Sequence, residues 1–350
     1  MSATVDTRQE TAGKPPRISS RRLTERVFRV RESGIIAVWI VFVAITVSIE
    51  PRFASQQEAQ FILANTTIFA LLALGQTMVI VSRNVDLSIG SVVGLSAYVS
   101  ANLFGTVHGM PIVVVFLVGL GIGLAVGVAN GLMVAIGRVP SLVVTLATLY
   151  IVRGLDILIV GGNEVVAQTL PNAFIEIPRA GVYGVPYLAI AIAVVIGIGA
   201  YYLRSYRSGR ELYAIGSNPE AARLAGIAVG RRVFTAFAVS GAIAGVAGVL
   251  WAAQYQTVDS NAGTGYELTV IASVVVGGVA IFGGSGSAVG AAIGALLLQT
   301  INSALYVLGI SPFWDQAIAG ALLLAAITLD RVISLRLTAA LRRRSAGVGT

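Results

Sequence analysis

Residues Gly209–Gly230, GRELYAIGSNPEAARLAGIAVG, form the longest polar break between the hydrophobic runs of this chain, apart from its N-terminal tail. Hydrophobic residues make up 56% of the chain and charged residues only 11%, and the mean hydropathy is +0.85. Soluble domains carry about 25% charged residues. Many of the 40 glycines lie within apolar runs, as in packed transmembrane helices. The composition thus predicts an integral membrane protein in which this polar break is an extramembrane loop.

The polar break carries signals for a short helix. Ser217 and Asn218 both suit a helix N-cap, and the proline that follows lacks an N–H at a position where none is needed. Ser217 and Glu220 have the spacing of a capping box, and Gly226 can end the helix in a left-handed conformation. The pattern predicts a helix at roughly 219–225 that stands outside the membrane.

The predicted helix has a small apolar ridge. It consists of Ala221, Ala222, Leu224 and Ala225, with Arg223 among them. A solvated loop needs no such ridge, whereas a helix that docks into another protein does. From the residues alone, docking and an ordinary helix on the protein's own surface are equally open.

Four motifs resemble the ribose-type sugar permeases of ABC importers. They are Gly209–Ile227, Arg83–Ser91 (RNVDLSIGS), Gly263–Glu267 (GTGYE) and Gly277–Gly286 (GGVAIFGGSG), and the resemblance covers roughly 34–330. Their order matches the family, and the Arg83-Asn84 pair and the GTGYE run are most similar to its autoinducer-2 and rhamnose permeases.

The resemblance implies a membrane-spanning subunit of an ATP-driven importer for a monosaccharide or a sugar-like solute. The solute class is ribose, xylose, rhamnose, galactose or autoinducer-2. The implied partners are an ABC ATPase subunit, a second permease copy or homologue, and an extracytoplasmic binding protein. In the family this loop carries the helix that couples to the ATPase. The matching residues are Ser217, Glu220, Ala221, Ala222, Arg223, Leu224 and Gly226.

Ten hydrophobic runs are interpreted as membrane spans, which need about 20 apolar residues each. The runs at 87–106 and 287–306 are rich in glycine and serine, so either is a candidate for a broken or re-entrant helix. The predicted fold is an all-α polytopic bundle. Its spans are 34–49, 61–82, 87–106, 111–137, 141–160, 185–203, 233–252, 267–283, 287–306 and 314–331.

Lysine and arginine are unequally divided between the two sides of these spans. Ten spans put both termini on one side, where 21 of the 24 Lys and Arg residues fall, whereas only Arg52 and Arg179 fall on the other. By the positive-inside rule the richer side is cytoplasmic, in a multi-pass protein of the inner membrane. The predicted regions are a basic, disordered tail at 1–33, a permease domain at 34–331 with a cytoplasmic loop at 204–232, and a basic tail at 332–350.

The sequence predicts no enzymatic chemistry in this chain. The Gly283–Ser287 run lacks the Gly-Lys-Ser/Thr ending of a Walker A loop, and Lys14 is the only lysine. ATP hydrolysis is therefore expected on a separate subunit. The chain has no cysteine and one histidine, so we expect neither a metal nor a cofactor. Because the positive charge is concentrated on one side of the predicted spans, we expect the chain to contact membrane lipid and not to bind nucleic acid.

A polar solute needs a pathway that is polar but binds weakly, because tight binding would stop release. Small polar residues cluster on three of the predicted spans, and Asn65 and Gln76 share a helical face to within roughly 20°. A pathway and hydrogen bonding between helices are equally open interpretations. The candidate lining residues are Asn65, Thr66, Gln76, Asn84, Asp86, Ser88, Ser91 and Asn302.

Several charged residues have both a structural and a functional interpretation. Asp86 suits the start of the next helix and can pair with Arg83, or it stands at the cytoplasmic mouth of the pathway. Arg153 and Asp156 lie one turn apart inside a span, where they either reach toward the interface or contact the binding protein. Glu267 either suits the N-terminus of its helix or contacts the binding protein.

The main rival function is an ion-coupled secondary transporter that acts without an ATPase. Such a transporter needs buried ion-coupling groups, for which Asp156 and Glu267 are the only nearby candidates. A membrane scaffold or receptor subunit without transport is a third class. An adjacent ATPase and a secreted binding protein would favour the importer.

Overall fold

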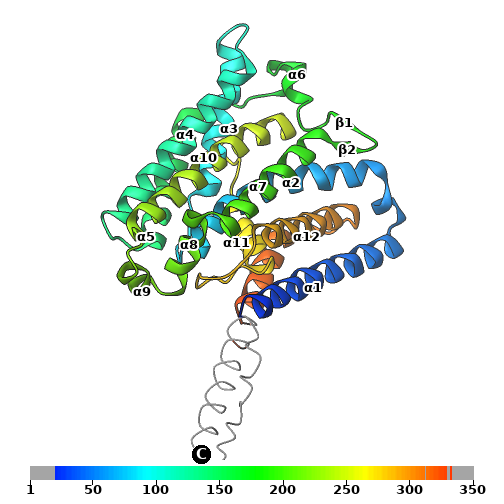
Figure 1. The fold of residues 1–350 in the computed structure, drawn as a ribbon. Coiled ribbons are helices and arrows are strands. Elements are labelled where there is room, and N and C mark those ends of the chain that lie inside the picture. The colour runs from blue at the N-terminus through cyan, green and yellow to red at the C-terminus, as the bar shows by residue number, and fades with distance from the viewer. Residues whose placement is uncertain (1–19, 312, 329–331, 333–350) are drawn as a thin grey trace, which may run out of the picture.

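The structure is a computed structural model that describes residues 20–311, 313–328 and 332, with side chains described from Glu32 onward. It is almost entirely helical, as predicted (Figure 1). Within the described residues, eight apolar helices are long enough to cross a membrane and two are shorter. They are α1 Ser20–Ile49, α2 Gln56–Val81, α3 Ile89–Thr106, α4 Ile112–Ala135, α5 Ser141–Val160, α7 Tyr187–Ser205, α10 Val229–Tyr255, α11 Tyr266–Val276, α12 Ala288–Val307 and the helix Trp314–Thr328.

The remaining elements connect these helices. Pro51–Ala54 and Ala167–Thr169 form 3-10 turns. The connection between α5 and α7 contains α6 (Asn172–Ile175) and a two-stranded antiparallel ribbon. Its strands are β1 (Gly181–Val182) and β2 (Val185–Pro186), and Val182 pairs with Val185. Between α7 and α10 lie α8 (Arg207–Ser217) and α9 (Pro219–Leu224).

Three of the predicted spans are clarified by the structure. The runs at 87–106 and 287–306 are continuous helices, α3 and α12, whereas the run at 267–283 ends as a helix at Val276. The helix stops because Gly278 adopts a φ of +98°, a left-handed conformation that an α-helix cannot contain. The glycine-rich segment that follows is therefore a turn between two helices.

The first helix also begins earlier than predicted. α1 starts at Ser20, so a disordered tail at 1–33 is wrong for its last part. The segment 20–33 contains no glycine or proline, and its Arg, Leu and Glu residues favour helix. Residues 1–19, and 333–350 of the C-terminal tail, lie outside the described residues.

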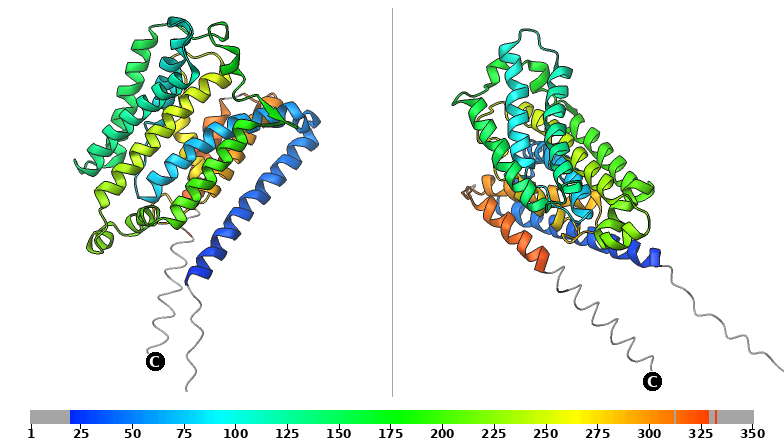
Figure 2. Two further views of the ribbon diagram at one scale, coloured as in Figure 1. Left: turned by 45° about the horizontal axis from the view of Figure 1, so that its top comes forward. Right: turned by 90° about the vertical axis from the view of Figure 1, so that its left-hand side faces the viewer.

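The bundle has a buried centre and apolar outer faces. The most apolar window of α2 is 94% buried, whereas that of α1, at the periphery, is 6% buried (Figure 2). The outward faces of α1, α4, α5 and α7 are apolar; examples are Val41, Leu117, Leu158 and Ile198, which are between 57% and 78% exposed. These faces suit the hydrocarbon of a bilayer, in which helices satisfy their own backbone hydrogen bonds.

Glycines bring α4 and α10 into backbone contact. Gly119, Gly123 and Gly127 recur every fourth residue on α4 and face Gly241 and Gly245 of α10. A Cβ added at Gly123 would fall only 2.6 Å from the backbone nitrogen of Gly245 and closer still to the carbonyl oxygen of Gly241. Without a hydrophobic driving force between helices in lipid, such close approach is a main source of attraction.

The two ends of the bundle differ in character. α8 and α9 lie at one end, and α6 with the β1–β2 ribbon lies at the other (Figure 1). The loops that carry Arg83, Arg138 and Arg223 meet at the α9 end, as the alternation of spans predicts. Which end faces the cytoplasm remains a prediction from the charge distribution.

We expect a reporter that is active only in the cytoplasm to function when fused after Thr350 and to fail when inserted near Ala173. The reason is the concentration of Lys and Arg on the α9 side of the membrane. Both fusions are measured in the same cells, with protein levels normalised by immunoblot. The opposite pattern of activity would overturn the orientation and every functional statement that depends on it.

Candidate functional site

The predicted helix in the polar loop is present as α9, and both of its ends are closed. The Asn218 side chain accepts hydrogen bonds from the backbone N–H groups of Glu220 and Ala221, each at 3.0 Å. Gly226 follows the helix with a φ of +78°, and its N–H donates to the carbonyl of Arg223 at 3.0 Å. Asn218 alone is the N-cap. The predicted Ser217–Glu220 capping box is wrong, because Ser217 is the last residue of α8.

The predicted docking ridge divides into an exposed and a buried part. Ala221, Leu224 and Ala225 are exposed, and Leu224 is 90% exposed. Ala222, in contrast, is 4% exposed and belongs to the buried cluster of Leu212. Ala222 therefore holds α9 to its own chain and cannot contact a partner, which corrects the prediction for that residue.

An unpredicted helix, α8, forms the platform on which α9 sits. Glu211 of α8 is buried, with its carboxylate 2.8 Å from Arg207 Nε and 2.5 Å from Arg232 Nε of α10. The hydrogen bond from Arg232, helped by that from Arg207, holds the pKa of Glu211 below its ordinary value despite burial. Gly216 of α8 also packs directly on the carbonyl of Val81 at the end of α2. These contacts fix the loop to the membrane helices.

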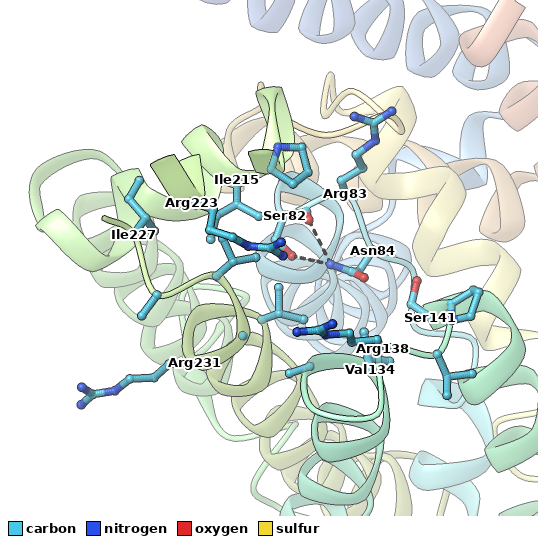
Figure 3. Close-up of a pocket in the computed structure, with 18 residues that line it drawn as sticks. Ser82, Arg83, Asn84, Val134, Arg138, Ser141, Ile215, Arg223, Ile227 and Arg231 are labelled. Atoms are coloured by element: carbon cyan, nitrogen blue, oxygen red, sulfur yellow. Dashed lines mark hydrogen bonds between the residues drawn. The ribbon is translucent and has the colours of Figure 1, made fainter. Parts of the chain in front are cut away.

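A basic cavity of about 710 Å³ opens beside α9 (Figure 3). Four arginines line it, two from interhelical connections, one from α9 and one from the start of α10, and none of the described lining residues is a carboxylate. Arg138 and Arg223 reach inward toward Asn84, whereas Arg83 and Arg231 point away from its centre. Arg83 and Arg138 also have φ values of 67° and 55°, which non-glycine residues rarely adopt. This end of the molecule is suited to an acidic surface.

The Asp86 carboxylate is part of a buried network and is not paired with Arg83. Both the backbone N–H and the hydroxyl of Ser88 donate to Asp86 Oδ1, at 2.9 and 2.6 Å. Asn130 Nδ2 of α4 donates to the Ser88 hydroxyl at 2.9 Å, and the Thr148 hydroxyl of α5 donates to Asn130 Oδ1 at 2.7 Å. Asp86 and Ser88 thus hold the α2–α3 connection against α4 and α5, and Ser88 rather than Asp86 is the N-cap residue of α3.

Ser91 and Asn84 also make local bonds. The Ser91 hydroxyl donates to the carbonyl of Ser88 at 2.9 Å, and Asn84 Nδ2 donates to the carbonyl of Ser82 at 2.9 Å. Ser91 is fully buried, whereas Asn84 is half-buried and lines the basic cavity. Of the four candidates in this connection, only Asn84 borders an open space.

The candidates on α2 and α12 likewise divide into residues that are buried and residues that line a cavity. Gln76 is fully buried with neither amide atom hydrogen-bonded, and the buried hydroxyl of Thr66 has no partner either. Asn65 Oδ1 accepts a hydrogen bond from the Tyr255 hydroxyl at 3.0 Å. Asn65 and Asn302 line one cavity at the end opposite α9. The shared helical face of Asn65 and Gln76 therefore does not form one continuous lining within this subunit.

The pair inside α5 is turned into the protein. Arg153 Nη1 lies 3.3 Å from Asp156 Oδ2 and also donates to the carbonyls of Ser260 and Ala262, at 3.2 and 2.8 Å. Asp156 is fully buried. Arg153 thus ties α5 to the segment before α11, and contact of the pair with a binding protein stays a prediction. Glu267 lies in the first turn of α11, where its charge suits the helix dipole.

The apolar helices and the two polar ends together define a polytopic helical membrane protein. The chain belongs to the family described as "Branched-chain amino acid transport system / permease component", whose model matches residues 59–327. It is a multi-pass protein of the inner membrane.

Three relatives illustrate the similarity. The "Autoinducer 2 import system permease protein LsrC" of Enterobacter sp. (strain 638) is 36% identical over 298 residues, which cover 85% of each chain. The "Ribose import permease protein RbsC" of Escherichia coli (strain K12) is 33% identical over 317 residues, 89% of this chain and 97% of that protein. RbsC of Haemophilus influenzae (strain ATCC 51907 / DSM 11121 / KW20 / Rd) is 33% identical over 308 residues, 87% of this chain and 94% of that protein. No solved structure matches this chain significantly.

Proposed function

We propose that this chain is the membrane-spanning subunit of an ATP-driven importer for a monosaccharide or a sugar-like solute. In this proposal two permease subunits, identical or homologous, form the pathway. Two ATPase subunits bind at the α9 end, and an extracytoplasmic binding protein delivers the solute at the other. ATP hydrolysis takes place on the ATPase subunits, since this chain lacks a Walker A lysine.

One observation carries the proposal, namely the geometry of α9. It is a helix closed at both ends, fixed to the bundle through Ala222, with Leu224 left 90% exposed at the most basic end of the molecule. An exposed leucine beside arginines at a water-facing end is expected where a partner covers it. A coupling helix of an ATP-driven transporter needs this combination of rigid attachment and free apolar surface.

The solute class is supported by similarity and by charge. The relatives are named as import permeases for autoinducer 2 and for ribose, and ribose is a neutral sugar rich in hydroxyl groups. Four arginines gather at the α9 end, and Arg153 inside α5 is already paired with Asp156. An anionic solute would therefore find few free cations along the helices.

The alternative function is an ion-coupled secondary transporter, and one uptake experiment distinguishes it from the importer. Uptake of labelled D-ribose, D-xylose and L-rhamnose is measured in cells that express the chain with its ATPase and binding protein. We expect uptake of at least one sugar to survive collapse of the proton and sodium gradients by ionophores. Deletion of the ATPase is expected to abolish it. Uptake that follows the ion gradients and persists without the ATPase would contradict the proposal.

A further inference from the structure

A polar cavity lies at the end of the bundle opposite α9, where α2, α10, α12 and the helix Trp314–Thr328 meet. It consists of two adjoining spaces of about 300 and 90 Å³ that share Tyr255, Asn302, Asp315 and Gln316. We call these spaces together the outer cavity. Together they approach the size of small-molecule sites, which begin near 300 Å³. None of the motifs recognised in the sequence contains these four residues.

The outer cavity interrupts an otherwise apolar surface. The exposed faces of α1, α4, α5 and α7 carry aliphatic side chains, whereas the outer cavity is lined by one carboxylate and by several amides. Charged and polar groups on membrane helices normally face protein or a water-filled cavity, because exposing them to lipid is costly. This side of the bundle is therefore not a lipid-facing surface, and a water-filled pathway would account for its polarity.

The lining groups can both donate and accept hydrogen bonds. Asn302 hydrogen-bonds to the Asp315 carboxylate, and the Tyr255 hydroxyl donates to Asn65. The side chain of Gln316 is exposed. Each hydroxyl of a polyol is both a donor and an acceptor, so it can pair with carboxylate, amide and phenol groups alike. Most of these groups are only partly buried, which favours weak binding and release.

Aromatic rings form the walls around this polar set. Phe61, Tyr255, Tyr306 and Phe313 line the larger space and are 41%, 38%, 64% and 90% exposed. Tyr255 is supported by Trp251, whose ring centroid lies 4.6 Å away. Such rings offer flat apolar surface to the C–H faces of a sugar ring, while the polar groups between them fix its orientation.

The charge of the outer cavity selects against anions. Among the described residues that line it, Asp315 is the only ionisable acid or base apart from tyrosines, and none is Arg, Lys or His. A phosphorylated or carboxylated solute would meet a carboxylate without a compensating cation. We propose that the outer cavity is a solute-binding station of the translocation pathway, selective for a neutral, polyhydroxylated solute of monosaccharide size. This inference rests on the proposed function.

The absence of cysteine from the chain allows a direct test. Tyr306→Cys places a single thiol at the rim of the outer cavity, and Glu164→Cys places one in an exposed loop on the same side of the membrane.

The full transporter in proteoliposomes is labelled with a maleimide in the presence of D-ribose, D-xylose, L-rhamnose, ribose 5-phosphate or choline, with isosmotic potassium chloride as reference. We expect at least one neutral sugar to slow labelling of Tyr306→Cys threefold or more. Labelling of Glu164→Cys should not change, and neither ribose 5-phosphate nor choline should protect.

Further substitutions test whether the polar side chains of the outer cavity cause the protection. In the Tyr306→Cys background, Asp315→Asn and Asn302→Leu are expected to remove protection, whereas the matched carboxylate variant Glu164→Gln retains it. Melting temperatures within about 3 °C of the parent show that the fold is intact, and Phe313→Cys replaces Tyr306→Cys if the latter is unstable. The inference would be overturned if no neutral sugar protects the thiol, if choline protects it equally, or if protection survives both substitutions.

ATP-dependent uptake is measured on the same samples. Uptake without protection refutes only the outer cavity, and protection without ATP dependence refutes only the importer.

Discussion

Replacing Gly123 with leucine is expected to prevent stable folding of the permease. A Cβ at Gly123 would lie 2.6 Å from the backbone nitrogen of Gly245 and 2.7 Å from its Cα, so α4 and α10 would have to separate. Real Cβ atoms essentially never come within 3.0 Å of a heavy atom outside their own residue and its chain neighbours. Overpacking of a core usually costs about 1–3 kcal/mol, and a clash with backbone on both sides of a helix crossing should exceed that range.

Gly121 provides a matched control on the same helix. It is exposed, and no heavy atom lies within 4 Å of its added Cβ. Gly121→Leu removes a helix-destabilising glycine and adds apolar surface on the lipid side, so it should accumulate at the parent level. We expect the melting temperature of Gly123→Leu in detergent to fall by about 10 °C or more, or the protein to be degraded. Equal melting temperatures for the two variants would show that close glycine packing does not hold these helices together.

Local signals were sufficient to predict α9 from the sequence. Asn218, the proline after it and Gly226 act on neighbours within one or two turns, so their effect does not depend on the rest of the fold. α8 was missed because its polar composition resembles that of a loop. The available signal was the helical spacing of Leu212, Ile215 and Gly216. Positions three and four residues apart lie on one face of a helix, and here that face is buried.

Which side of α9 faces the protein could not be predicted. Ala221 and Ala222 are chemically identical, and only the position of α8 beneath them makes one exposed and the other buried. The network around Asp86 shows the same limit, since Asn130 lies 42 residues from Ser88 in the chain. An asparagine within the apolar run of α4 was a usable signal, because polar groups inside membrane helices normally have a partner. The identity of that partner depends on helix packing.

The family and the class of protein were predictable because they depend on composition and on short motifs. The number of apolar runs agrees with the described helices, and the family model covers residues 59–327. The lining of the pathway was less predictable. Of its eight candidates, Asn65 and Asn302 border the outer cavity and Asn84 borders the basic one. The side chains of Asp86, Ser88, Ser91 and Gln76 and the hydroxyl of Thr66 are buried and border neither. A small polar side chain serves helix packing and a solute pathway equally well, and sequence alone does not separate the two.

Ala221→Glu and Leu224→Glu are expected to uncouple the permease from its ATPase. Both side chains are exposed in the permease, so neither substitution should lower its melting temperature. In a docked complex each would bury an unpaired charge, which costs roughly 3–5 kcal/mol when the contact is dry. That cost corresponds to a loss of affinity of more than about 100-fold. Binding is measured by co-purification and by titration of the ATPase against permease in nanodiscs, together with ATP-dependent uptake.

Two further variants separate docking from stability at this helix. Leu224→Met keeps an apolar side chain of similar volume and should retain both ATPase binding and uptake. Ala222→Leu inserts volume into the cluster shared with Leu212 and Ile215, so it should lower the melting temperature before it affects binding. The opposite outcome, in which the glutamate variants bind and transport normally while Ala222→Leu alone fails, would show that α9 is an internal support. Because Ala221 and Ala222 are neighbours with opposite exposure, contrasting effects at these two positions can arise only if the outer face of α9 meets a partner.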